Sequence, residues 1–177
     1  MITSRIQIGD DKVYDTESMF GLIQIDSDNI LGAPSKDFEK TTYPEEEGEH
    51  IHPVTVDNAF KYKVKFFVSA KGGLDAANWK ISEFNSAICS DNEGVKTYKR
   101  ITFYNDYKGV KIVGYPNPIH TATEFWRDKY GKQHDVVCVE LVINVDKPSL
   151  CNFNLANEDY EVFYVQQELF YVKKNKQ

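Results

Sequence analysis

The sequence predicts a mostly β protein, a β-sandwich or barrel with one flanking α-helix. Three observations lead to this prediction. The 177-residue chain contains 11 Tyr and 11 Phe, and aromatic side chains fit the pleated surface of a sheet. Several segments alternate apolar and polar residues with the period of two that is typical of a half-buried strand. Leu74–Ile88 instead repeats its apolar residues every three or four positions, as an amphipathic helix does.

The strand around which the domain is built is expected at residues 59–68. Its apolar side chains fall on one face and its lysines on the other. The apolar face holds Tyr62, Val64, Phe66 and Val68, and the opposite face holds Lys61, Lys63 and Lys65. Lys71-Gly72-Gly73 ends this strand, and the helix follows with Asp75 as its expected N-cap and Trp79 as an anchor beside its apolar stripe.

Turn-forming residues divide the chain before this strand. Residues 1–13 are expected to form a hairpin arm added to the domain, and residues 14–25 a polar turn followed by a short strand. Residues 35–58 hold many charges and turn formers. We expect them to be an exposed loop, apart from a short edge strand at 38–43.

Strand patterns also dominate the chain after the helix. Strands are expected at 95–104, 110–115, 119–126 and 136–145, with a hairpin loop at 105–109 and a central position for the last strand. This gives a main domain at 14–148 and a C-terminal extension at 149–177. Within the extension, residues 160–172 are rich in Tyr, Phe and Val, and fit a last strand, a hairpin or an arm that pairs with another subunit. The expected core is Val64, Phe66, Val68, Ile81, Phe84, Ile101, Phe103, Val137, Val139, Leu141 and Ile143.

The charge of the chain is unevenly distributed. Residues 1–60 contain 4 of the 21 basic residues and 13 of the 27 acidic residues, so the rest of the chain is mildly basic. This asymmetry suits neutralisation within one subunit, and it also suits head-to-tail packing of copies. The three cysteines are too few for a disulfide framework, and no segment has the length and hydropathy of a membrane span or a signal peptide. We therefore expect a soluble intracellular product.

Few residues suggest chemistry. His50 and His52 beside the acidic run 45–49 resemble a metal site, but a solvated, metal-free loop is the better interpretation. Ser86, Cys89 and either His120 or His134 would supply a nucleophile and a base, yet no turn motif frames them. The lysines of residues 59–68 lie on the face opposite Tyr62 and Phe66, which does not favour nucleic-acid binding. We expect no catalytic, cofactor-binding or metal-binding residues and no enzyme activity.

The order of elements resembles the N-terminal domain of phage distal tail proteins, relatives of the tail tube proteins. The matching segments are Tyr14-Asp15-Thr16, Phe20-Gly21-Leu22, Ala33-Pro34, 44–48, 62–68, 79–87 with Asn85-Ser86-Ala87, 95–114 and 136–148. The N-terminal hairpin is additional to the family pattern. The polar loop lacks the usual Arg-Asp pairing, and residues 149–177 are too short for the second domain that is common in the family.

The resemblance implies a tail-tube-like domain that assembles as a hexameric ring in a virion tail. Its partners would be other tail proteins, namely tube, tape-measure and baseplate components, and DNA would pass through the lumen without specific binding. Assembly would take place in the cytoplasm of the host bacterium. The acidic segment 37–49 and the lysines at 61, 63, 65, 96 and 99 are then the expected complementary patches of neighbouring copies.

Two other functions remain open from the residues themselves. A β-sandwich binding module for a glycan or a protein would use the aromatic residues Tyr104, Tyr107, Tyr115 and Trp126, which are expected on loops. A hydrolase or a metal enzyme would use the residues described above. Neighbouring tape-measure or tube genes would favour the tail protein, and polysaccharide-utilisation genes would favour the binding module.

Overall fold

The computed structural model describes residues 4–37, 39–41, 50–52, 56–69, 73–117, 120–127, 130–131, 133–155, 160–165 and 168–173. The main sheet consists of β1 (Ser4–Ile8), β2 (Val13–Asp15), β3 (Leu22–Ser27), β6 (Phe60–Ser69), β9 (Ile101–Asn105), β10 (Val110–Pro116), β11 (His120–Arg127) and β12 (Gln133–Val145). Separate hairpins consist of β4 (Glu39–Thr41) with β5 (His50–His52), β7 (Cys89–Asn92) with β8 (Val95–Tyr98), and β13 (Tyr160–Val165) with β14 (Glu168–Lys173). The helices are α1 (Thr16–Phe20), α2 (Leu74–Ile88) and the 3-10 turn η1 (Pro148–Leu150).

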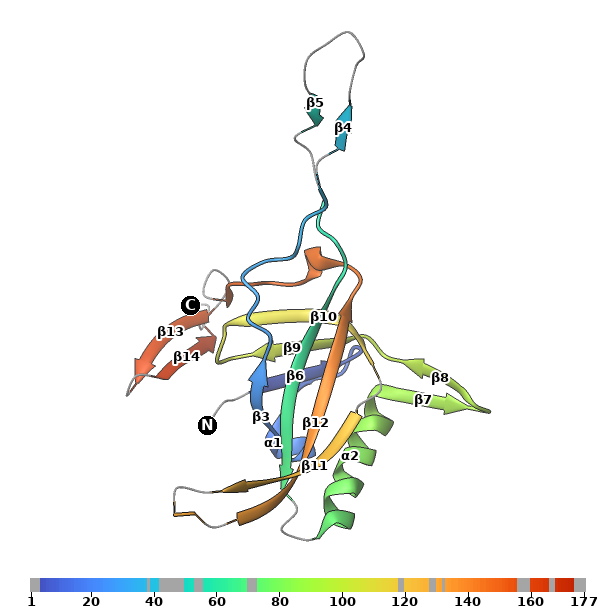
Figure 1. Ribbon diagram of the computed structural model, residues 1–177, viewed down its shortest axis with the longest axis vertical. Helices are drawn as coiled ribbons and strands as arrows, with labels where there is room; N and C mark the ends of the chain where they lie inside the picture. Colours follow the sequence, from blue (N-terminus) through green and yellow to red (C-terminus); the bar gives the residue numbers. More distant parts are fainter. Residues whose placement is uncertain are drawn as a thin grey trace.

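The protein is mostly β, as predicted, and its main sheet is antiparallel and folded over. The strand order is β2-β1-β9-β10-β12-β6-β3, with β11 also paired to β12. The end of β10 joins the two parts of the sheet through the pairs Tyr115↔Asn144 and Pro116↔Ile143. Figure 1 shows that β9 and β10 cross the direction of β6 and β12, and that α2 lies beside the latter part. This arrangement is that of a β-sandwich with a flanking helix.

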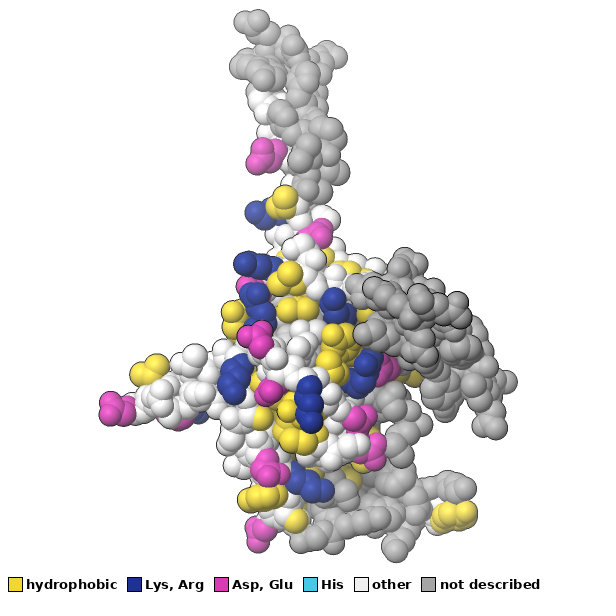
Figure 2. Space-filling model, turned by 180° about the vertical axis from the view of Figure 1, so that it is seen from behind, with side chains coloured by type: hydrophobic (Ala, Val, Ile, Leu, Met, Phe, Trp, Pro, Cys, Tyr) yellow, Lys and Arg dark blue, Asp and Glu magenta, His cyan; other side chains and the backbone are white. Residues whose placement is uncertain are grey.

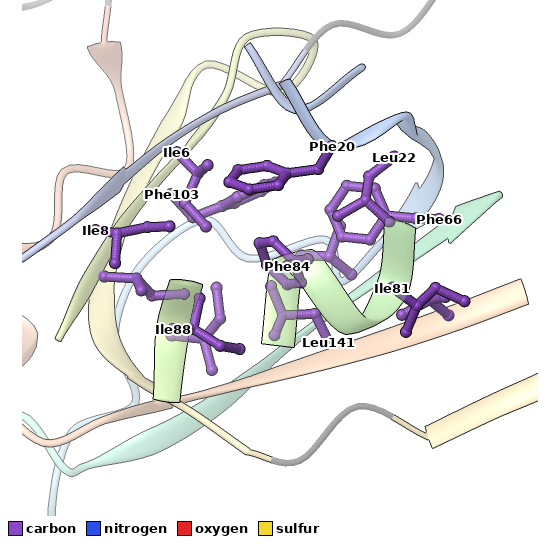
Figure 3. Close-up of a cluster of buried hydrophobic side chains, with 14 of the residues drawn as sticks. Ile6, Ile8, Phe20, Leu22, Phe66, Ile81, Phe84, Ile88, Phe103 and Leu141 are labelled. Carbon is purple, nitrogen blue, oxygen red and sulfur yellow. The ribbon is translucent and has the colours of Figure 1, made fainter. Parts of the chain in front are cut away.

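The core lies between these two parts and α2, and contains the residues that alternation predicted. Each of the eleven expected core residues is at most 5% exposed. In Figure 3, Ile6 and Phe103 from one part of the sheet converge with Phe66 and Leu141 from the other, and Phe84 of α2 lies among them. The register Phe66↔Val139 places the apolar faces of β6 and β12 on the same side.

Helix α2 has the predicted bounds, but two details of the prediction are wrong. Its N-cap is Gly73, whose φ of 91° favours glycine, and Asp75 lies in the first turn without capping it. Leu74 and Trp79 do not join the core, because they are 48% and 64% exposed. The buried stripe is therefore shorter than the pattern of the sequence and consists of Ala77, Ile81, Phe84 and Ile88.

The N-terminal hairpin is part of the main sheet instead of an added arm. Strand β1 pairs with β9 from Ser4↔Asn105 to Ile8↔Ile101, and Ile6 is fully buried. The short helix α1 was not predicted. Its local signals are present, because the Asp15 carboxylate accepts a hydrogen bond from the Ser18 amide at 2.7 Å and Gly21 ends the helix at φ 67°.

The segments expected as one strand at 95–104 and as a loop at 35–58 also need correction. Residues 95–104 belong to two strands, β8 and β9, separated at Lys99 and Arg100, and only β9 enters the core. The 35–58 segment contains a strand within the range expected at 38–43, namely β4, but β4 pairs with β5 as a hairpin, so His50–His52 is a strand as well. The strand expected at 136–145 starts earlier, at Gln133. Residues 160–165 and 168–173 adopt the hairpin, one of the three predicted possibilities.

Candidate interaction surfaces

A groove lies between α1 and α2 on the surface of the domain. It has a volume of about 500 Å³ and is lined by Met19, Phe20, Trp79, Ser82, Glu83, Ser86 and Ala87. Met19 and Trp79 are 53% and 64% exposed, so two large apolar side chains border it. Exposed apolar side chains that gather in one place are typical of an interaction site.

The groove results from an aromatic contact between the two helices and from small serine side chains next to the large Trp79 on α2. Phe20 of α1 meets Phe84 of α2 edge-on, with ring centroids 5.0 Å apart, and this contact holds α1 against α2. Trp79 lies three and four residues before Ser82 and Glu83, and Ser86 lies four and three residues after them, so the four share a face of α2 beside its buried stripe. Because the two serines are small, they leave a hollow next to the indole ring.

A second, smaller groove lies where β6 begins and where β10 and β12 end. It has a volume of about 270 Å³ and is lined by Ala59, Phe60, Lys61, Tyr115, Asn144, Val145 and Asp146. The Arg100 guanidinium lies 4.9 Å from the centre of the Tyr115 ring and forms an ion pair with Asp146 at 2.6 Å. Tyr115 is 40% exposed, so a planar aromatic surface is held in place beside polar groups.

The β7–β8 hairpin extends away from the end of α2 (Figure 1). Its turn is Glu93-Gly94, where both residues have positive φ, 53° and 84°, and the Asp91 carboxylate accepts a hydrogen bond from the Gly94 amide. Positive φ at both residues is the geometry of a two-residue type I′ turn, which matches the twist of a hairpin. Val95 follows the turn and is 68% exposed.

The residues considered for catalysis or metal binding are not brought together in one described site. Ser86 lines the α1–α2 groove, and Cys89 begins β7. His120 pairs with Glu140 and His134 pairs with Trp126, so the two histidines stand at opposite ends of the β11–β12 ladder, about 20 Å apart.

His50 and His52 belong to β5, but their side chains and residues 45–49 are outside the described part of the chain. Within the described part, no group of three His, Cys, Asp or Glu residues is placed to hold a metal ion.

The aromatic residues expected on loops are mostly on strands. Tyr104 and Tyr115 belong to β9 and β10, and Trp126 belongs to β11 with its side chain outside the described part. Tyr107 does lie in the β9–β10 turn and is 48% exposed. The Arg5 guanidinium lies 5.0 Å from the centre of the Tyr104 ring, so this tyrosine packs on a side chain of β1.

The lysines of β6 project outward as predicted and do not form a uniform basic stripe. Lys63 lies 4.0 Å from Glu140 on the neighbouring strand. In Figure 2, Lys and Arg side chains alternate with Asp and Glu across the described part of the visible face. Such a mixed surface gives little attraction to a nucleic-acid backbone, which needs a basic patch.

The buried polar groups near β9 are structural. The Asn105 side-chain amide donates hydrogen bonds to the Tyr62 hydroxyl at 3.1 Å and to Ser27 Oγ at 2.8 Å. Burial raises the pKa of the Tyr62 phenol, so the phenol remains protonated and is unsuited to act as a base. Burial likewise raises the pKa of the Cys151 thiol, which accepts a hydrogen bond from the Val113 amide at 3.3 Å.

The fold and these surfaces define an antiparallel β domain with a flanking helix, whose exposed features are grooves and hairpins suited to macromolecular contact. No helix in the described residues has the length and apolar character needed to cross a membrane. No protein-family model matches the sequence, and a search of curated proteins found no relative.

Among solved structures, the chain is similar to the Dit protein (gp 19.1) of SPP1, described as a paradigm of the hub adsorption apparatus in phages that infect Gram-positive bacteria. The TM-score is 0.49 at 16% sequence identity, and the match covers 82% of this chain and 50% of that chain. The chain therefore spans about half the length of that protein.

Proposed function

We propose that this chain is a structural, ring-forming component of a phage or phage-derived tail, a distal tail or tube-like protein without catalytic activity. The observation that carries the proposal is the set of hairpins that leave the folded core. Within the described residues, β4–β5, β7–β8 and β13–β14 each pair only with themselves, and the first two extend well beyond the main sheet (Figure 1). An isolated two-stranded hairpin is marginally stable in water, so such extensions favour a protein that packs against neighbours.

The resemblance of the sequence supports the tail as the place of this assembly. The elements expected from it follow in the same order in this chain: the strand β3, the long strand β6, the Trp79-bearing helix α2, the β9–β10 hairpin and the long strand β12. We propose a ring of six copies in the virion tail, with tube, tape-measure or baseplate proteins as partners. DNA passes through its lumen without specific binding, and assembly takes place in the cytoplasm of the host bacterium.

Purified protein is expected to form a hexamer at high concentration or with a neighbouring tail protein. Because opposite charges assist the contact, the hexamer is expected to weaken as salt is raised. Deletion of residues 160–177 is expected to weaken it as well, if that segment adds a strand to a neighbour. Light scattering across concentration and salt, with electron microscopy of the particles, tests these expectations. A strict monomer under all conditions, with no ring beside the neighbouring gene products, would overturn the proposed function.

A binding module for a glycan or a protein is the second candidate, because Tyr115 presents an aromatic surface in a groove. In that case Tyr115→Ala is expected to abolish retention of the protein on purified bacterial cell-wall polysaccharide, since a sugar ring loses the surface on which it stacks. Tyr130→Ala is the matched control, because Tyr130 is an exposed tyrosine outside the groove lining. Equal retention of both variants and of the unmodified protein would exclude the Tyr115 groove as the binding site.

A further inference from the structure

We infer that the β7–β8 hairpin of one copy docks, through β8 and Val95, in the groove between α1 and α2 of a second copy. The inference deepens the proposed function and rests on it, because it names the two patches that meet in the ring.

The hairpin has one face without charge. The pairs Ser90↔Thr97 and Asn92↔Val95 share that face, and all four residues are exposed. The charged residues Asp91 and Lys96 are paired with each other on the opposite face. Burial of Val95 in a contact would remove its apolar surface from water. The small polar side chains around it cost less to desolvate than charged ones, so this face is the one suited to a contact. Figure 2 shows a hydrophobic side chain near the free end of this hairpin.

The hairpin is also shaped before it binds. Its two-residue turn has positive φ at Glu93, which is costly for a residue with a side chain, and the Asp91 carboxylate supports the turn at Gly94. A preformed segment loses less conformational entropy on binding than a flexible one. The turn geometry and its Asp91 hydrogen bond therefore favour docking of the hairpin as a unit.

The groove offers the complementary features. Met19 and Trp79 present apolar surface, and Ser82 and Ser86 leave room for a small branched side chain such as valine. Glu83 is the charged member of the lining, and Glu17 and Asp75 lie in the first turns of the two helices. On the hairpin, Asp91 and Lys96 lie on the opposite face, so its uncharged face would meet the apolar surface of Met19 and Trp79 without burying a charge of its own.

The hairpin cannot fill the groove of its own chain. Strand β7 begins at Cys89, directly after the last residue of α2, and leads away from the helix in Figure 1. Three steps of extended chain from Cys89 to Asn92, and the pairing of Asn92 with Val95, place Val95 about 11 Å from that starting point. Two different patches that can meet only between copies make a heterologous contact, which closes into a ring when its rotation allows.

Two variants of the full chain test this contact. Val95→Asp places a charge on the uncharged face, and Ser86→Arg fills the hollow beside Trp79. Each is expected to raise the dissociation constant of self-association at least about tenfold in analytical ultracentrifugation. Val95→Asp would force a charge to be desolvated, and the Arg side chain of Ser86→Arg would occupy the groove. The matched controls are Leu31→Asp, at a residue 91% exposed, and Asn78→Arg, on α2 but outside the lining. The controls are expected to assemble like the unmodified chain.

The outcomes separate the inference from the proposed function. If the unmodified chain forms rings and both test variants assemble as well as their controls, this contact is wrong while the tail function stands. If the unmodified chain remains monomeric at every concentration and with its neighbouring gene products, both are overturned. Circular dichroism melts identical to those of the unmodified chain establish that any loss of assembly comes from the surface and not from unfolding.

Discussion

The Phe66→Ala variant is expected to lose about 3–5 kcal/mol of unfolding free energy. Phe66 is 1% exposed, and its ring meets the Phe103 ring edge-on with centroids 6.1 Å apart. It joins β6 to the other part of the sheet, so its removal leaves a cavity at the contact between the two parts. Urea denaturation followed by circular dichroism measures the loss. The control is Tyr107→Ala, which removes a half-exposed aromatic ring and is expected to change stability by at most about 0.5 kcal/mol.

An unchanged urea midpoint for Phe66→Ala would contradict the register of β6. A shift of the strand by one residue would exchange its buried and exposed faces, so Lys65 would then occupy the core position. The comparison of Phe66→Ala with Tyr107→Ala therefore tests the register as well as the depth of burial.

Gly114→Ala is expected to destabilise the protein by about 1–3 kcal/mol, because β10 has no room for a methyl group where it meets β12. A Cβ atom at this position would lie 2.3 Å from the backbone oxygen of Asn144 and 2.9 Å from Cγ2 of Ile143. The backbone oxygen belongs to the strand pairing that joins the two parts of the sheet. The strain therefore falls on the connection that gives the sandwich its shape.

Gly32→Ala is the matched control for this substitution. A Cβ atom at Gly32 meets nothing within 4 Å, and the residue has no positive φ that would disfavour alanine. Its stability is expected to stay within about 0.5 kcal/mol of that of the unmodified protein. Equal urea midpoints for Gly114→Ala and Gly32→Ala would show that β10 and β12 are farther apart than described.

Local patterns in the sequence predicted the buried face of an element correctly where that face borders the core along most of the element. Strand β6 has the core on one side throughout, so the alternation of Tyr62, Val64, Phe66 and Val68 predicted its buried face. Helix α2 has the core along its middle and its C-terminal end, so the spacing of Ala77, Ile81, Phe84 and Ile88 predicted the helix and most of its stripe.

Local patterns failed where the environment changes within a segment. Val95, Thr97, Lys99, Ile101 and Phe103 would share one face of a single strand, yet the first half of this segment belongs to an exposed hairpin and the second half to the core. The same residue types suit both surroundings, and only the pairing of β8 with β7 and of β9 with β1 distinguishes them.

Periodicity alone was enough to predict the mostly β class, the position of α2 and the core of β6, β9 and β12, because it records which face of an element is buried. The place of β1 in the main sheet depends on long-range pairing, since its partner β9 is about 100 residues away and no local signal records that pairing. The candidate contact sites depend on tertiary packing in the same way. The α1–α2 groove requires the contact between Phe20 and Phe84. Trp79 is exposed because no other element packs over it, and the local sequence does not record this.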